Sequence, residues 1–157
     1  SLVQGQALGG GFEAALAANV VIAERQSKLG LPEVMFNMFP GMGAYQLLTR
    51  RLSPAQAEDL ILSGRTHSAE ELYEMGLIDV LAETGDGEAA VMRYIKKRHR
   101  QFDANQGLRR AIQAAHPLDY GALIRVAEVW VEQAMALKGR DLELMDYLIR
   151  AQQRMQH

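Results

Sequence analysis

The spacing of hydrophobic positions changes along the chain, from short apolar runs to a helical period. Residues 2–8 and 20–23 are short apolar runs that predict buried strands, and residues 12–18 are rich in strong helix formers. Strand, glycine turn, helix and strand, in this order, predict a crossover unit of the α/β class, which is normally right-handed.

The middle of the chain is interrupted by glycine and proline. Residues 27–42 are therefore predicted to form a loop, and a short helix is expected over residues 43–51. Residues 77–81 form a further apolar run, which predicts a strand or an extended tail.

Two helix starts can be placed from their capping residues. Ser53 with Gln56, and Ser68 with Glu71, both have the spacing of a capping box, in which the two residues bond to each other's backbone N–H. Gly64 follows the first of these helices at a position where glycine commonly ends a helix.

After Gly85 the pattern is helical throughout. The apolar residues of segments 126–137 and 142–149 recur on one face of a helix. The polar residues 84–87 join the two patterns. We therefore divide the chain into an α/β part, residues 1–83, and a helical region, residues 84–157.

Composition narrows the class of protein. The 157 residues are 48% hydrophobic and 23% charged, which is the balance of a folded globular protein. A net charge of -2 gives no footprint for nucleic acid, and no run is long enough to span a membrane. Without cysteine there are no disulfides or thiolate metal sites. No secretory signal is visible, so we expect a cytoplasmic protein, and a start without methionine predicts an excised part of a longer chain.

Three consecutive glycines, Gly9, Gly10 and Gly11, stand between the first strand and the first helix. Glycine lets a ligand approach the backbone closely, and the helix N-terminus that follows has unpaired N–H groups. Together they can hold an anion, such as the enolate oxygen of a thioester. The alternative is a tight strand-to-helix turn that binds nothing.

Two glutamates are the candidate acids. Glu13 lies in the first helical turn, where a carboxylate can also serve only to complement the helix dipole. Glu33 has apolar neighbours that would raise its pKa on burial and suit it to proton transfer, and an exposed loop acid is the alternative. With the glycine turn, the pair forms a coherent set: one carboxyl for the proton α to a carbonyl, the other for the β-oxygen.

These residues carry a resemblance to the crotonase (enoyl-CoA hydratase/isomerase) superfamily. Residues 3–13 (VQGQALGGGFE) are similar to its G-x-A-x-G-G-G-x-E element, and residues 29–33 (LGLPE) to its F-G-x-P-E element. Residues 40–44 (PGMGA) resemble its P-G-x-G-G turn, and residues 64–78 resemble a further stretch of the family. The resemblance implies the C-terminal part of a crotonase-like ββα spiral core. It also implies that the helices that follow mediate assembly into trimers or hexamers.

Within the superfamily the chain most resembles the diffusible signal factor synthases, over residues 9–25, 30–33 and 39–45 and parts of the last two helices. This resemblance implies dehydration of a 3-hydroxyacyl thioester on acyl carrier protein, followed by hydrolysis to a free cis-2-enoic acid signal. It also implies a sensor kinase as a binding partner. It implies no cofactor or metal, because the substrate is carried as an acyl carrier protein or CoA thioester.

The resemblance also assigns roles to residues. Gly10 would supply one oxyanion-hole N–H, Glu33 would take the α proton, and Glu13 would protonate the departing hydroxyl or activate water, although the two acid roles can be exchanged. The substrate-binding residues would be Gly9, Gly11, Leu31, Pro32, Gly41 and Met42. The family's other oxyanion-hole N–H comes from an N-terminal half that is not in this sequence, so the chain by itself is not expected to be a complete enzyme.

The remaining polar and aromatic residues have plainer interpretations. The basic run 96–100 is assigned to the solvated end of a helix, with a contact to acyl carrier protein as the alternative. Trp130 is assigned to the core or a subunit interface, and Tyr45 to helix packing instead of the acyl site. The histidines lack metal-ligand spacing and are interpreted as surface or capping residues: His67, His99, His116 and His157.

Two other functions are consistent with this sequence. A general enoyl-CoA hydratase or isomerase would differ from a signal synthase in carrier and in product geometry. A non-catalytic subunit that binds a sensor kinase would not need the two acids. The presence of both Glu13 and Glu33 argues against a purely non-catalytic role.

Overall fold

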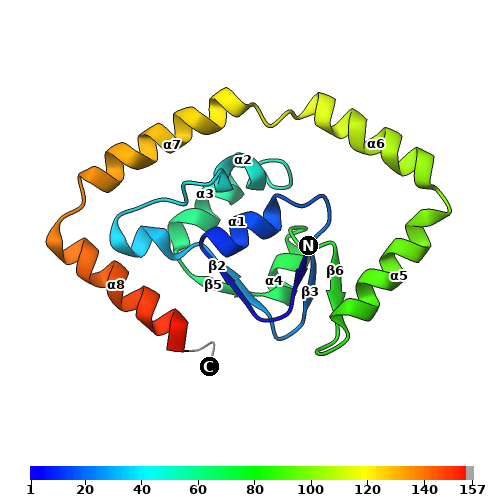
Figure 1. Ribbon diagram of the computed structural model, residues 1–157, viewed down its shortest axis with the longest axis horizontal. Coiled ribbons are helices and arrows are strands. Elements are labelled where there is room, and N and C mark those ends of the chain that lie inside the picture. The colour runs from blue at the N-terminus through cyan, green and yellow to red at the C-terminus, as the bar shows by residue number, and fades with distance from the viewer. Residues whose placement is uncertain (155–157) are drawn as a thin grey trace.

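A computed structural model describes the backbone of residues 1–154 and the side chains of residues 1–151. A small α/β core lies at the centre, and four helices form an arc around it (Figure 1). We call these helices the helical arm: α5 (Gly87–His99), α6 (Phe102–Ala115), α7 (Tyr120–Met135) and α8 (Gly139–Arg154). The predicted α/β class with a helical C-terminal region is confirmed.

Two three-stranded sheets form the core. The first is parallel, in the order β1 (Leu2–Val3), β3 (Ile22–Glu24) and β6 (Val80–Ala82). The second is mixed, in the order β2 (Gln6–Leu8), β4 (Lys28–Gly30) and β5 (Thr66–Ser68), with β4 and β5 antiparallel. The chain passes from the first sheet to the second twice, between β1 and β2 and between β3 and β4, as a ββα spiral requires.

The single strand predicted over residues 2–8 is wrong in one respect, because the segment is divided between the two sheets. The corner falls at Gly5, whose carbonyl oxygen accepts from the Lys28 N–H at 2.9 Å. The matching corner is at Ser27, which is fully buried and donates from its hydroxyl to the Val3 carbonyl oxygen at 2.9 Å. These bonds hold the two corners against each other.

The prediction that residues 27–42 form only a loop is also wrong. They contain β4 and a short 3-10 helix, η1 (Pro32–Phe36). An added Cβ at Gly30 would lie 2.6 Å from the carbonyl oxygen of Arg65, so this glycine marks a close approach of two strands and not a turn.

The predicted helix starts are confirmed. The remaining helices are α1 (Gly10–Leu16), α2 (Ala44–Leu48), α3 (Pro54–Ser63) and α4 (Ala69–Glu74). Ser53 and Ser68 both form complete capping boxes, and Gly64 ends α3 in the left-handed conformation, with φ of 59°. These caps fix the ends of α3 and α4 from local sequence alone.

The largest hydrophobic cluster lies between the sheets and α1–α4. It includes Phe12, Leu29, Leu48, Leu72 and Leu77, all with 0% exposure. Each such side chain contributes about 1.5–3 kcal/mol through burial, so this cluster is the main source of stability for the core.

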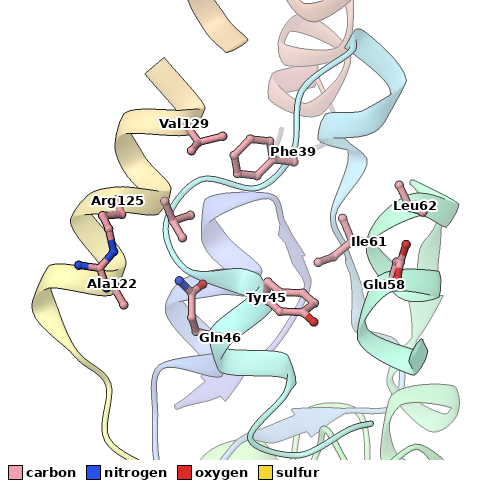
Figure 2. Close-up of a pocket in the computed structure, with 10 residues that line it drawn as sticks. Phe39, Tyr45, Gln46, Glu58, Ile61, Leu62, Ala122, Arg125 and Val129 are labelled. Carbon is pink, nitrogen blue, oxygen red and sulfur yellow. The ribbon is translucent and has the colours of Figure 1, made fainter. Parts of the chain in front are cut away.

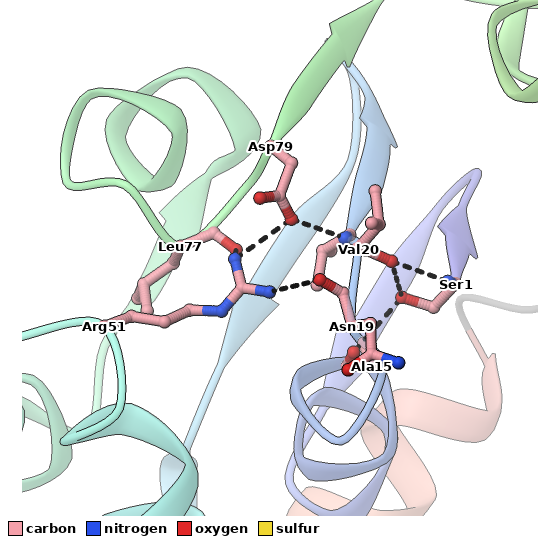
Figure 3. A network of polar contacts seen from close by, with 8 residues as sticks. Ser1, Ala15, Asn19, Val20, Arg51, Leu77 and Asp79 are labelled. Carbon is pink, nitrogen blue, oxygen red and sulfur yellow. Dashed lines mark hydrogen bonds and ion pairs between the residues drawn. The ribbon is translucent and has the colours of Figure 1, made fainter. Parts of the chain in front are cut away.

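A polar network fixes the point at which β3 begins (Figure 3). The Arg51 guanidinium lies 3.0 Å from the Asp79 carboxylate and donates to the carbonyl oxygens of Leu77 and Asn19. Asp79 also accepts from the Val21 N–H at 2.7 Å. One arginine therefore joins the connection after α1 to the connection between α4 and β6.

Within the arm, α5 packs against the parallel sheet through Ala90, whereas α6 and α7 contact the core lightly. Neither α6 nor α7 has a fully buried residue, and Leu108, Val129 and Val131 are each more than half exposed. The basic run at the end of α5 is solvated, as predicted. No helix among residues 1–154 is long and apolar enough to cross a membrane.

Glu24 joins the arm to the core. Its carboxylate is 2% exposed and accepts from the Gly87 N–H at the start of α5, at 2.9 Å, and from the Gln4 amide, at 3.1 Å. Hydrogen bonds from the side chains of Gln26 and Gln4, and from the backbone, lower the pKa of Glu24 to about 2. The start of the arm therefore depends on an ionised, hydrogen-bonded carboxylate.

We expect Glu24→Gln to lower the melting temperature by several degrees, because an amide accepts these bonds more weakly than a carboxylate. The folded pKa of about 2 lies below the ordinary value of 4.5, so the stabilisation is present above about pH 4.5 and is lost as the pH falls through 2. Thermal melts between about pH 3 and pH 7 should show that the difference in melting temperature between Glu24→Gln and wild type narrows below pH 4.5. Glu88→Gln, at an exposed position in α5 beside Gly87, is the control. A difference in melting temperature from wild type that stays constant on acidification would contradict the assignment.

Candidate active site

Both predicted acids line one cavity of about 440 Å³. Its walls come from the glycine turn, η1, residues 38–42 and the arm helices α7 and α8. Apart from Glu13 and Glu33, the described residues that line it are apolar side chains or glycines. The core thus supplies the acids, and the arm supplies an apolar wall.

Glu13 is almost completely buried, at 2% exposure. Its Oε1 accepts from the backbone N–H of Met42 at 2.8 Å and of Ala44 at 3.0 Å. Burial raises the pKa of Glu13, and these two hydrogen bonds oppose the rise. A carboxyl that only complemented the helix dipole would not need this environment, because it could remain in water.

Glu33 is partly buried in η1, directly after Pro32. Burial, with a smaller contribution from the charge of Glu13, raises the pKa of Glu33 to about 7. Its Oε2 is buried without a hydrogen-bond partner. The alternative of an exposed loop acid is therefore wrong. A carboxyl with this pKa can accept or donate a proton near neutral pH.

The glycine turn is shaped by Gly9, which has φ of 55° and ψ of -127°. Its N–H donates to the Gly30 carbonyl oxygen at 2.9 Å, and its own carbonyl oxygen accepts from the N–H groups of Phe12 and Glu13. Gly10 begins α1, where the first N–H groups have no acceptor within the helix. An added Cβ on Gly9 would lie 2.7 Å from Glu33 Oε1, so the turn and the acid are in close contact.

The turn at residues 41–44, which donates to Glu13, is covered by α7. An added Cβ on Gly41 would lie 2.3 Å from Trp130 Cδ1, and one on Gly43 would lie 2.9 Å from Leu123 Cδ2. Trp130 therefore rests on the Gly41 backbone and lines the cavity, which corrects its assignment to the core, while the alternative of a subunit interface stays a prediction.

Sequence reasoning also missed three residues of α8 that line the cavity: Met145, Leu148 and Ile149. Helical periodicity marks them as one apolar face, but it does not identify what that face covers. Five of the predicted contact and oxyanion residues do line the cavity: Gly9, Gly10, Pro32, Gly41 and Met42.

Two predicted contact residues are not part of the cavity lining. Leu31 is fully buried in the core, because the strand before it directs this side chain between the sheets. Gly11 is exposed, and an added Cβ there would meet nothing within 4 Å. Neither residue lines the cavity that holds the two acids, and their contact with substrate stays a prediction.

The three histidines that the structure describes differ in burial. His99 and His116 are exposed, as predicted, and His157 lies outside the described residues. His67 contradicts the prediction: it is 3% exposed, and both ring nitrogens are buried without partners. Burial lowers the pKa of His67, so it is held as a neutral core side chain. No group of three His, Asp or Glu residues within the described chain is arranged to hold a metal ion.

A second, more apolar pocket of about 580 Å³ lies beside α2, α3 and α7 (Figure 2). Tyr45 is half exposed and lines it, instead of packing within a helix interface. Its charged residues are Glu58 and Arg125, and it contains neither candidate acid. The cavity that holds Glu13 and Glu33 is therefore the better candidate for chemistry.

A spiral α/β core with two neighbouring carboxyls in an apolar cavity defines the crotonase class of fold and site. In agreement, the model of the enoyl-CoA hydratase/isomerase family matches residues 1–117, and the chain belongs to this family.

Individual relatives agree with this assignment. The chain is 39% identical over 138 residues to cyclohexa-1,5-dienecarbonyl-CoA hydratase of Thauera aromatica. The aligned region covers 85% of this chain and 52% of that protein. Among solved structures it is similar to a carnitinyl-CoA hydratase from Mycobacterium avium, with a TM-score of 0.72, 26% identity and coverage of 89% of this chain and 54% of that one. An enoyl-CoA hydratase from Mycobacterium tuberculosis gives a TM-score of 0.65 at 27% identity, and the match covers 95% of this chain and 60% of that one. The chain thus spans little more than half the length of these relatives.

Proposed function

We propose that the protein hydrates or dehydrates the α,β bond of an acyl thioester, with Glu13 and Glu33 as its acid–base pair. The observation that carries this proposal is the pair of carboxyls in one apolar cavity, where burial raises the pKa of Glu33 to about 7. Proton transfer at neutral pH needs a carboxyl that is neither fully ionised nor fully protonated. Membership of the enoyl-CoA hydratase/isomerase family supports the thioester class of substrate.

In the dehydration direction, the Glu33 carboxylate removes the proton α to the thioester carbonyl. The electron pair forms the new Cα–Cβ double bond as the C–O bond of the β-hydroxyl breaks. Glu13 donates its proton to the departing oxygen, which leaves as water. Because Oε1 of Glu13 already accepts two N–H groups, Oε2 is the oxygen that carries this proton. Hydration is the same sequence in reverse.

The Gly10 N–H is proposed to stabilise the negative charge that develops on the thioester carbonyl oxygen as the α proton is removed. It lies in the first turn of α1, beside the cavity. Gly9, Pro32, Gly41 and Met42 are proposed to contact the substrate near the reacting carbons, because they line the cavity between the two acids and the arm.

We further propose that the substrate is a 3-hydroxyacyl chain on acyl carrier protein and that the product is a free cis-2-enoic acid signal. Two observations support this narrower function: the resemblance of residues 9–25 and 39–45 to signal synthases, and an apolar wall that suits an acyl chain. Release of the acid requires a thioesterase step, in which Glu13 or Glu33 would activate water. A general enoyl-CoA hydratase or isomerase is the second candidate, favoured by the identity to CoA-dependent relatives.

Self-association is proposed from the exposed apolar side chains of the arm, since covering such a surface stabilises an oligomer. A trimer or hexamer is the form expected from the resemblance. The basic run 96–100 is proposed as a contact for acidic acyl carrier protein, and a sensor kinase as a further partner.

The test is a product analysis with the full-length protein. A medium-chain 3-hydroxyacyl carrier protein and a trans-2-enoyl-CoA are supplied separately, and products are identified by mass spectrometry and double-bond geometry. A free cis-2-enoic acid formed from the carrier protein supports the signal-synthase function. Hydration of the CoA ester alone would reject that function and leave the hydratase. Turnover that survives in both Glu13→Gln and Glu33→Gln would reject the acid–base pair itself.

A further inference from the structure

The short helix that carries Glu33 ends at an unusual residue. Asn37 has φ of 58° and is the one non-glycine residue with positive φ among those described. Asparagine tolerates this left-handed conformation better than most residues, and such positions often occur where the surrounding structure holds a functional group in place. The contacts of Asn37 therefore bear on the site.

The last two helices of the arm, α7 and α8, both bond to Asn37. Its side-chain amide donates to Asp141 Oδ1 of α8 at 2.7 Å, and its carbonyl oxygen accepts from the Gln133 amide of α7 at 2.9 Å. The second oxygen of Asp141 accepts from the Lys138 N–H at 3.0 Å, in the turn between the two helices. We call Asn37, Gln133 and Asp141 the Asn37 clamp.

The position of Glu33 depends on the backbone of η1. The Glu33 carbonyl oxygen accepts from the Met38 N–H at 3.1 Å, and the Val34 carbonyl oxygen accepts from the Asn37 N–H at 3.2 Å. Asn37 therefore closes the same turn that carries the acid. The carboxyl itself lacks a partner at Oε2. A 3-10 helix of five residues with no buried residue is weakly held by its own bonds, so it needs support from outside.

We propose that Asn37, Gln133 and Asp141 are positioning residues that hold Glu33 at the correct place for proton transfer, so that docking of the arm completes the acid–base pair. This inference rests on the proposed acyl-thioester function. Glu13 has its own support, because α7 covers the 41–44 turn that donates to it. The arm thus supports each acid through a separate contact.

The first test removes the clamp without straining the backbone. Asn37→Gly keeps positive φ accessible and keeps the carbonyl acceptor but loses the amide, and Gln133→Met keeps side-chain length but loses the donor. Each is expected to lower kcat about tenfold, with KM changed by less than about twofold, because a misplacement of about 1 Å can cost about 100-fold. The exposed neighbour Glu132→Gln is the matched control and should behave as wild type.

A double variant separates positioning from a general loss of stability. If Asn37 and Asp141 act through one contact, Asn37→Gly combined with Asp141→Ala should lower kcat no further than either change alone. Two fully additive losses would contradict the clamp. So would a drop in kcat that follows the melting temperature of each variant.

The second test does not need turnover. ¹³C NMR titration of the glutamate side chains in full-length protein should place the pKa of Glu33 at about 7 in wild type and nearer its ordinary value of 4.5 in Asn37→Gly. Glu13 is the other titratable group among the described residues that line this cavity, and Asp141 lies at the far end of η1. An unchanged titration in both clamp variants would overturn the proposal. A wild-type protein inactive on every thioester would reject the proposed function while this titration still decides the clamp.

Discussion

Glu33→Gln is expected to lose turnover by about 100- to 10,000-fold, the range that general acid–base catalysis supplies, and to become more stable than wild type at neutral pH. Turnover falls because an amide cannot exchange the α proton. Stability rises because the variant no longer places an ionisable carboxyl, with one unpartnered oxygen, in an apolar cavity. A loss of activity accompanied by a gain in stability is the signature of a group retained for chemistry.

The sign of the pH dependence follows from the raised pKa. The folded pKa of Glu33, about 7, lies above its ordinary value of 4.5, so its contribution to stability is complete below 4.5 and is lost as the pH rises through 7. The full shift corresponds to about 3 kcal/mol, and to about 1–2 kcal/mol after discounting for solvent screening at a partly exposed group. Urea unfolding should therefore show that the free energy of unfolding of Glu33→Gln rises relative to that of wild type between about pH 5 and pH 8.

The control for this experiment is Glu58→Gln, an exposed glutamate of α3 outside the cavity. Its stability relative to wild type should not change over the same pH range. If Glu33→Gln also shows a constant difference from wild type, the carboxyl is not held in a low-dielectric cavity, and the proposed role in proton transfer loses its physical basis.

The sequence predicted the acids better than it predicted what covers them. Glu13 and Glu33 are only 20 positions apart, and local motifs place both beside glycine turns. Trp130 and Asp141 reach the same region from about 100 positions away: Asp141 bonds to Asn37 across a separation of 104 residues. Helical periodicity identifies their helices but carries no information about which part of the core each helix meets.

The same limit explains the smaller errors. Residues 2–8 have the pattern of one strand, and only the pairing with β3 and β4 shows that the segment divides between two sheets. His67 is polar by type but lies in β5 opposite Leu29, where the sheet buries it. Caps at Ser53 and Ser68 were predictable because every atom they need lies within four residues.

The three consecutive glycines are expected to respond differently to alanine, with Gly9 the most sensitive. At Gly9, φ of 55° with ψ of -127° is a conformation that alanine avoids, and the new Cβ would lie 2.7 Å from Glu33 Oε1. Gly9→Ala should therefore destabilise the protein by about 1–3 kcal/mol and displace Glu33, lowering kcat by about 100-fold.

Its neighbours are the internal controls for Gly9→Ala. Gly11 has open space at its Cβ position and lies in α1, so Gly11→Ala should be neutral or stabilise by up to about 1 kcal/mol through helix propensity. At Gly10 the added Cβ would lie 3.1 Å from the flexible end of Met42, which can move, and the N–H is kept, so the loss of kcat should be modest. Urea unfolding and kcat of the three full-length variants check this order. Equal effects at all three positions would mean that the turn serves only to connect the strand to the helix, because a turn that shapes the cavity must depend on Gly9 far more than on Gly11.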